Sequence, residues 1–82
     1  MRGGYSRRMT SGTTVLWRLR GDTLRNIVCL TYRTASGLVA LRIALERETL
    51  LEEIYPDVRS ATNRAAAIRD SLVRDGWLID AA

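Results

Sequence analysis

Residues 39–72, VALRIALERETLLEEIYPDVRSATNRAAAIRDSL, change their hydrophobic period near Asp57. Before this residue, apolar side chains occupy every second position, at Val39, Leu41, Ile43 and Leu45. After it, they recur every three to four residues, at Ala61, Ala65, Ile68 and Leu72. The first spacing is typical of a half-buried strand and the second of an amphipathic helix. The sequence therefore predicts an α+β fold in which antiparallel strands precede one C-terminal helix.

The same alternation, followed toward the N-terminus, predicts a three- to four-stranded antiparallel β-meander. Its strands are expected over residues 13–20, 24–33 and 38–47, with a shorter one over 50–55. Gly21-Asp22 suits a two-residue hairpin turn, and Ala35-Ser36-Gly37 suits the next turn. Pro56 is expected to end the last strand, because it has no N–H to donate to a sheet.

The helix is expected to begin near Asp57 or Ser60, since either side chain can accept a hydrogen bond from a free backbone N–H of the first turn. It should run to Arg74. Gly76 fits the left-handed position that follows a helix, and Trp77 is then placed to fold back on the last turn.

Pairing the strands through two-residue turns predicts which side chains share a face. The face expected to pack against the helix holds Val15, Trp17, Leu19, Val28, Leu30, Tyr32, Val39, Leu41, Ile43 and Leu45. The uncovered face is expected to hold Leu16, Arg18, Arg20, Arg25, Ile27, Cys29, Thr31, Arg33, Leu38, Ala40, Arg42 and Ala44. A shift of one residue in the pairing would turn a strand over, because successive side chains point to opposite faces.

Length and composition predict one small domain. The chain has 82 residues and a net charge of +4, and all its basic residues are arginines. The segment from Thr13 onward contains ten arginines and nine acidic residues, so most of the net positive charge lies in the first dozen residues. We expect residues 1–12 to form a disordered basic arm and residues 13–82 to form the domain. One cysteine and no long apolar segment favour a cytoplasmic location without membrane insertion.

The residue types present exclude several chemistries. The chain has no histidine and one cysteine, which rules out imidazole-based catalysis and zinc sites built from these two residue types. No phosphate-binding glycine loop is present. Four carboxylates near the last hairpin, Glu46, Glu48, Glu52 and Glu53, suggest a polar connection, with a cation site as the alternative. We therefore expect no enzyme activity, no catalytic or metal-binding residues, no cofactor and no small-molecule substrate.

The uncovered face is the predicted functional surface, because it mixes arginines with apolar side chains as interface cores do. Its candidate partner-binding residues are Arg18, Arg20, Arg25, Arg33, Arg42, Leu16, Ile27 and Leu38. The predicted function is a non-enzymatic protein-interaction module, either a homodimer or an accessory subunit of a larger assembly. The alternative is a nucleic-acid-binding domain that uses the same arginines together with the N-terminal arm.

Trp17 in the first strand, the two turns and Asp75-Gly76-Trp77 after the helix resemble a loose group of short uncharacterised bacterial proteins built from a β-meander and a helix ending in Gly-Trp. The resemblance covers residues 13–78 and implies a fold but no activity. The topology is also similar to DNA-binding domains of the plant type and of integrase arms, which lay a sheet in the major groove. None of their residue motifs is present here, and a shared fold does not determine function.

Overall fold

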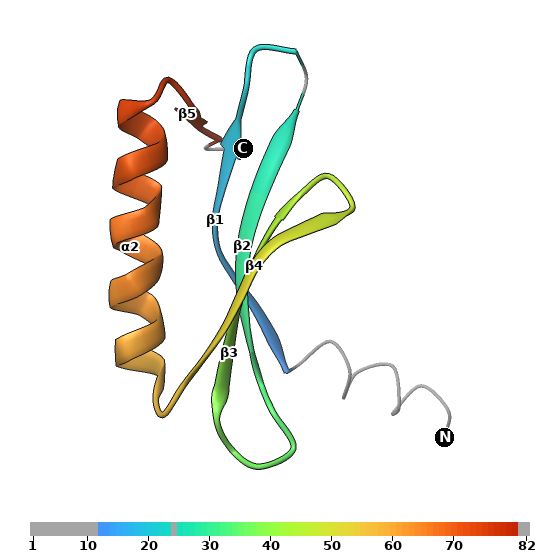
Figure 1. Ribbon diagram of the computed structural model, residues 1–82, viewed down its shortest axis with the longest axis vertical. Helices are drawn as coiled ribbons and strands as arrows, with labels where there is room; N and C mark the ends of the chain where they lie inside the picture. Colours follow the sequence, from blue (N-terminus) through green and yellow to red (C-terminus); the bar gives the residue numbers. More distant parts are fainter. Residues whose placement is uncertain (1–11, 24, 81–82) are drawn as a thin grey trace.

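One helix lies across one face of an antiparallel sheet (Figure 1). This computed structural model describes residues 12–23 and 25–80. The elements, in chain order, are β1 (Thr13–Arg20), β2 (Asn26–Arg33), β3 (Val39–Leu45), β4 (Glu48–Tyr55), α2 (Val58–Arg74) and β5 (Leu78–Ile79). The predicted α+β class, with a meander followed by one helix, is confirmed. Most of the predicted N-terminal arm lies outside the described residues.

Both ends of α2 lie where the sequence predicts them. The Asp57 carboxylate accepts a hydrogen bond from the Ser60 N–H at 2.8 Å, which caps the first turn. At the other end, Gly76 has a φ of 111°, and the Trp77 N–H donates to the Leu72 carbonyl. This is the Schellman arrangement, which reverses the chain direction after the helix. This turn places Trp77 and β5 against the sheet.

The sheet has five strands in the order β4-β3-β2-β1-β5. Its first four members follow the predicted meander. The fifth, β5, was not predicted; it pairs with β1 at Leu19 and Arg20. Because β5 has only two residues, its sequence carries no detectable alternation. It forms because the end of α2 directs the chain along β1.

The pairing of β1 with β2 differs from the prediction by three residues. A two-residue turn at Gly21-Asp22 would place Trp17 opposite Asn26, but Trp17 lies opposite Cys29. The connection instead spans residues 21–25, with a hydrogen bond from the Gly21 N–H to the Arg25 carbonyl at 2.8 Å. Since the difference is an odd number of residues, β2 presents the opposite face to the helix.

The predicted faces of β2 are therefore wrong. Ile27, Cys29 and Thr31 are buried beneath α2, whereas the side chains expected in the core, Val28, Leu30 and Tyr32, lie on the other side of the sheet. The second turn also differs from the prediction, by one residue, which returns β3 to its expected orientation. A β-bulge between Val15 and Trp17 likewise exchanges the predicted positions of Val15 and Leu16.

The core lies between α2 and the sheet. Its buried cluster consists of Trp17, Leu19, Ile27, Cys29, Leu41, Ile43 and Ala65. The small side chains of Ala61 and Ala65, both buried, let the first half of α2 approach the strands closely. Among the described residues, no second helix covers the other side of the sheet. We call that side, which faces away from α2, the open face.

Candidate interaction surface

The open face is defined by the strand register. Its members, from β1, β2, β3 and β4, are Thr13, Val15, Arg18, Arg20, Asn26, Val28, Leu30, Tyr32, Ala40, Arg42, Ala44, Thr49, Glu52 and Ile54. Side chains that are directly opposite on neighbouring strands lie about 5 Å apart, so they form rows across the sheet. These rows determine which chemistry each part of the face presents.

The centre of the open face is apolar. One row places Val28 between Arg18 and Ala44. The next row places Leu30 between Val15 and Arg42. Val28 and Leu30 are only partly buried, although both belong to the central strand of the sheet. The centre of the sheet therefore presents branched aliphatic side chains to the outside.

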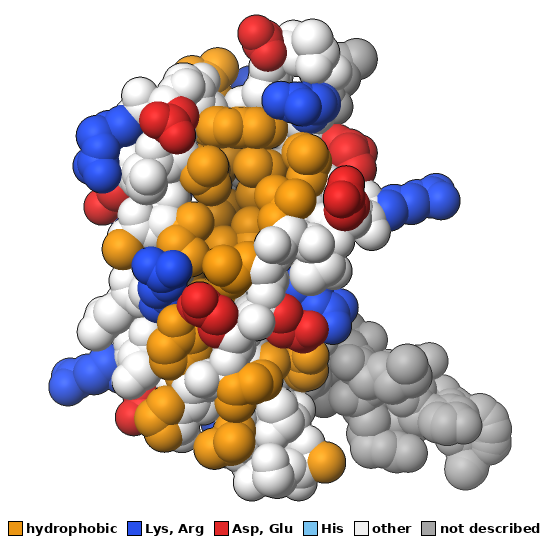
Figure 2. All heavy atoms as spheres, viewed as in Figure 1, with side chains coloured by type: hydrophobic (Ala, Val, Ile, Leu, Met, Phe, Trp, Pro, Cys, Tyr) orange, Lys and Arg blue, Asp and Glu red, His pale blue; other side chains and the backbone are white. Residues whose placement is uncertain are grey.

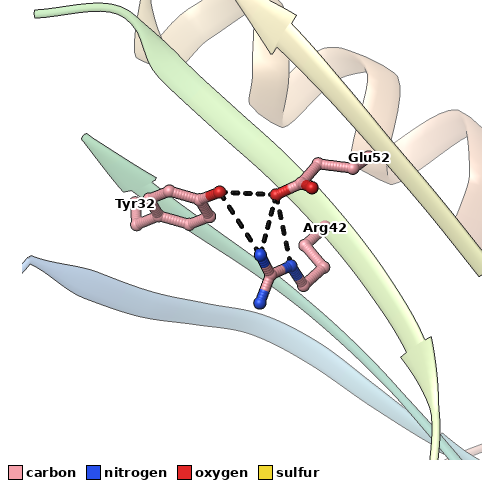
Figure 3. Close-up of polar contacts among 3 residues, drawn as sticks. All are labelled: Tyr32, Arg42 and Glu52. Carbon is pink, nitrogen blue, oxygen red and sulfur yellow. Dashed lines mark hydrogen bonds and ion pairs between the residues drawn. The ribbon is translucent and has the colours of Figure 1, made fainter. Parts of the chain in front are cut away.

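Tyr32, Arg42 and Glu52 form a polar network beside this apolar centre (Figure 3). The Tyr32 hydroxyl donates to Glu52 at 2.5 Å, and the Arg42 guanidinium donates to the same carboxylate oxygen at 2.9 Å. The guanidinium also lies 5.3 Å from the centre of the Tyr32 ring. The three residues come from β2, β3 and β4, so the network joins three neighbouring strands.

The hydrogen bonds of the network shift the pKa values of Glu52 and Tyr32 in opposite directions. The pKa of Glu52 is lowered, first by the hydrogen bond from Tyr32 and then by the one from Arg42. The pKa of Tyr32 is raised, mainly because its hydroxyl proton is held by the Glu52 carboxylate. Glu52 is therefore ionised and Tyr32 neutral at pH 7. Together they hold the planar Arg42 group in one orientation.

The predicted partner-binding arginines do not form one surface. Arg18, Arg20 and Arg42 hold open-face positions. Arg25 lies in the β1–β2 loop, where its guanidinium stacks 5.4 Å from the centre of the Trp77 ring. Arg33 lies at the far end of β2, where it donates to the Gly37 carbonyl at 3.1 Å. The expectation that all five arginines share one face is wrong, because it used the reversed orientation of β2.

Two of the three apolar candidates also lie elsewhere than predicted. Ile27 is 2% exposed in the core, and Leu16 packs against the core from the β-bulge in β1. Leu38 is exposed, as expected, but in the loop before β3. The prediction missed Val15, Val28, Leu30, Tyr32 and Ile54 as open-face side chains. No signal in β2 itself reveals this, because both sets of alternate positions in Asn26–Arg33 hold apolar residues.

The four carboxylates near the last hairpin are dispersed. Glu52 joins Arg42 on the open face, whereas Glu53 faces α2 and pairs with Arg64 at 3.2 Å. Glu46 accepts a hydrogen bond from the Asn26 N–H at 2.7 Å. Within residues 12–23 and 25–80, no three side chains of the usual acidic, histidine or cysteine types are grouped to hold a metal ion. Glu46, Glu52 and Glu53 therefore act separately, as partners of strands and helix.

Cys29 lies at the centre of the core and is fully buried. Burial raises the pKa of its thiol to about 11, because the thiolate would lose its hydration. The thiol is therefore protonated at neutral pH. It acts as a small apolar side chain of the core, whereas the sequence pattern placed it on the uncovered face.

A shallow cavity of about 290 Å³ lies between the β1–β2 loop and the end of α2. Arg20, Arg25 and Trp77 contribute to its walls, together with Asp22 and Asp75. Its volume is at the lower limit of ligand pockets, which usually measure roughly 300–1,000 Å³. Its two arginines and two aspartates balance in charge, so it favours no ligand of one sign.

No known protein family matches this chain, and neither a curated protein nor a solved structure is significantly similar to it. In the part of the chain that the structure describes, no helix is long and apolar enough to span a bilayer.

Proposed function

We propose that this protein is an interaction module that docks a partner protein on its open face. The observation that carries the proposal is the apolar centre formed by Val15, Val28, Leu30 and Ala44, on the side of the sheet that no helix of the described residues covers. Contiguous exposed apolar surface on a small protein marks interaction sites, because burial of such surface favours association. Val28 and Leu30, on the central strand, are unlike the exposed positions of a solvated sheet face, where polar side chains alternate with the core positions.

The residues around the apolar centre also support protein recognition. Tyrosine and arginine are enriched among the residues that contribute most to binding at protein interfaces. Tyr32 and Arg42 are already held in place by Glu52. A partner that contacts them would lose less side-chain entropy than one that must order free side chains. Arg18 and Arg20 lie at the edge of the apolar centre, where charged groups orient an approaching partner.

Nucleic-acid binding has weaker support. Of the five candidate arginines, Arg25 and Arg33 lie off the open face, and the charge of Arg42 is balanced by Glu52. Phosphate recognition requires several uncompensated positive charges along one surface. Binding to a mixed-sequence DNA duplex, measured at increasing salt concentrations, separates the two functions. Tight binding that weakens steeply with salt would replace the protein-docking proposal with the nucleic-acid one.

The test compares two substitutions that each add one acidic group to an exposed or partly exposed apolar position. Leu30→Glu changes the centre of the open face, whereas Val58→Glu changes a 51% exposed residue at the start of α2. Both variants should keep the wild-type circular dichroism spectrum. Immobilised wild-type protein and Val58→Glu should retain the same protein from a lysate of the source organism, and Leu30→Glu should lose it. Equal retention of that protein by all three would contradict the proposal.

A further inference from the structure

Among the residues that the structure describes, no strand pairs with the outer edge of β4. It is the outermost strand, and its eight residues make it as long as β1 and β2. The opposite edge is different, because β5 covers β1 at Leu19 and Arg20 and the Asp80 N–H donates to the Arg18 carbonyl. A free strand presents unpaired N–H and C=O groups that can pair with another chain.

β4 carries two kinds of feature that protect edge strands, namely three glutamates and one bulge, but neither blocks its whole length. Its sequence, ETLLEEIY, contains no lysine, arginine or proline, which are the usual protecting residues. The charges of its two central glutamates are balanced by arginines, since Glu52 forms an ion pair with Arg42 and Glu53 forms one with Arg64. A single bulge, at Leu50, interrupts the pairing with β3 and leaves Leu51–Tyr55 regular. The edge is therefore open to a further strand.

Several apolar side chains of the layer between α2 and the sheet remain partly exposed. Leu45, Leu51, Ile68 and Leu72 pack against the core but are only partly buried. Leu50 in β4 is 50% exposed. Figure 2 shows a broad hydrophobic patch between α2 and the β3–β4 hairpin, bordered by charged side chains. The apolar side chains between α2 and the sheet are therefore partly exposed to solvent on this side.

We propose that a second copy of this chain occupies this side, with β4 of each copy paired antiparallel to the other. The pairing would continue the sheet across the two copies and place both helices on the same face, beside each other. Each copy would then supply what the other lacks, namely a strand for the edge and a helix beside the open apolar layer. A two-fold axis makes such an interface self-complementary, as in most homodimers.

A foreign extended segment fits this side less well. It would cover the edge of β4 but leave the apolar side chains of α2 and β3 exposed. The molecule measures 43 × 28 Å along its two longer axes, which are the axes of the view in Figure 2. This outline sets an upper limit on the area available, and the limit lies above the roughly 800 Å² that each partner buries in a standard stable interface. The open face would remain accessible in such a dimer, so the inference goes beyond the proposed function.

The test is the mass of the full chain in solution, measured by sedimentation equilibrium at micromolar concentrations. The wild type should have twice the monomer mass of 9.2 kDa. Leu50→Lys places a charge on the β4 edge and should give a monomer with an unchanged circular dichroism spectrum. The matched control is Leu78→Lys, at a 59% exposed position on the opposite edge of the sheet, which should remain dimeric. Leu30→Glu should also remain dimeric, which separates this interface from partner docking.

A monomeric wild type would overturn the proposal, as would a Leu50→Lys variant that stays dimeric. If Leu50→Lys does not fold, amide hydrogen exchange of the wild type decides the question. Protection of those Glu48–Tyr55 amides that point away from β3 should then rise with protein concentration, since a second copy supplies their partners. Protection that does not depend on concentration would overturn the proposal.

Discussion

The indole N–H of Trp17 donates a hydrogen bond to the backbone carbonyl of Ala65 at 3.0 Å, and this contact joins the first strand to the middle of the helix. The two residues are 48 positions apart. Trp17 also contributes its ring to the buried cluster, and Ala65 is small enough to let the helix approach the ring. One side chain thus fixes both the distance and the orientation of α2 relative to the sheet.

Replacing Trp17 by Phe should lower the free energy of unfolding by about 2–4 kcal/mol. About 1 kcal/mol of this comes from the lost hydrogen bond, and the rest comes from the space that the smaller ring leaves in the core. Urea unfolding followed by circular dichroism measures the change. A loss below about 0.5 kcal/mol, which is the range of ordinary surface substitutions, would mean that the contact does not hold the helix in place.

Gly21 and Trp77 should be coupled in stability. A Cβ added at Gly21 would lie 2.9 Å from the Trp77 ring, which is closer than such atoms can approach. Gly21→Ala should therefore cost about 1–3 kcal/mol in the wild type, as overpacking does. The cost should be much smaller in a Trp77→Leu background. Equal costs in the two backgrounds, measured in a double-mutant cycle, would contradict the contact.

Gly76→Ala should destabilise the fold by about 1 kcal/mol for a different reason. No atom lies within 4 Å of a Cβ added here, so the cost comes from the φ of 111° alone. Thermal unfolding should show a lower melting temperature, while Ser71→Ala, an exposed position in the last turns of the helix, should have little effect. A stabilised Gly76→Ala variant would show that the helix continues through this residue.

Tyr32→Phe should raise the pKa of Glu52 toward the ordinary glutamate value of 4.5, since the hydroxyl is the largest cause of its lowering. The folded pKa lies below the unfolded one, so the network's contribution to stability is complete above pH 4.5 and is lost as pH falls through the folded value. Carboxyl NMR titration measures the midpoint. Tyr55→Phe, which removes the hydrogen bond to Glu53, is the control and should leave the midpoint of Glu52 unchanged.

The helix and most strand positions could be predicted because their signals are local. Asp57, Pro56 and Gly76 act within a few residues of where they stand, and the alternation in Val39–Leu45 has polar or small residues at its other positions. The orientation of β2 could not be predicted in this way. Its alternate positions are apolar on both sides, so the length of the preceding loop decides which side is buried.

That loop length depends on a tertiary contact that the local pattern does not contain. A glycine stands at position 21 because the Trp77 ring packs against the loop there. It does not occupy the first position of a two-residue turn. The wrong orientation of β2 also made the predicted interaction surface wrong, because this orientation determines which apolar side chains of β2 lie on that surface. Arg18, Arg20 and Arg42 were placed correctly since β1 and β3 kept their expected orientation in those segments, whereas Ile27 exchanged places with Val28.

Photo-cross-linking from two matched valines can show whether a partner protein docks on the open face. Val15 lies on the open face and is 41% exposed, and Val58 lies at the start of α2 and is 51% exposed. Benzoylphenylalanine is placed at one position or the other, and the folded proteins are irradiated in a lysate of the source organism. We expect a cross-link from position 15 to one specific protein, reduced by the Leu30→Glu substitution, and no such product from position 58. A product of equal yield from both positions, or none from position 15, would contradict the docking proposal.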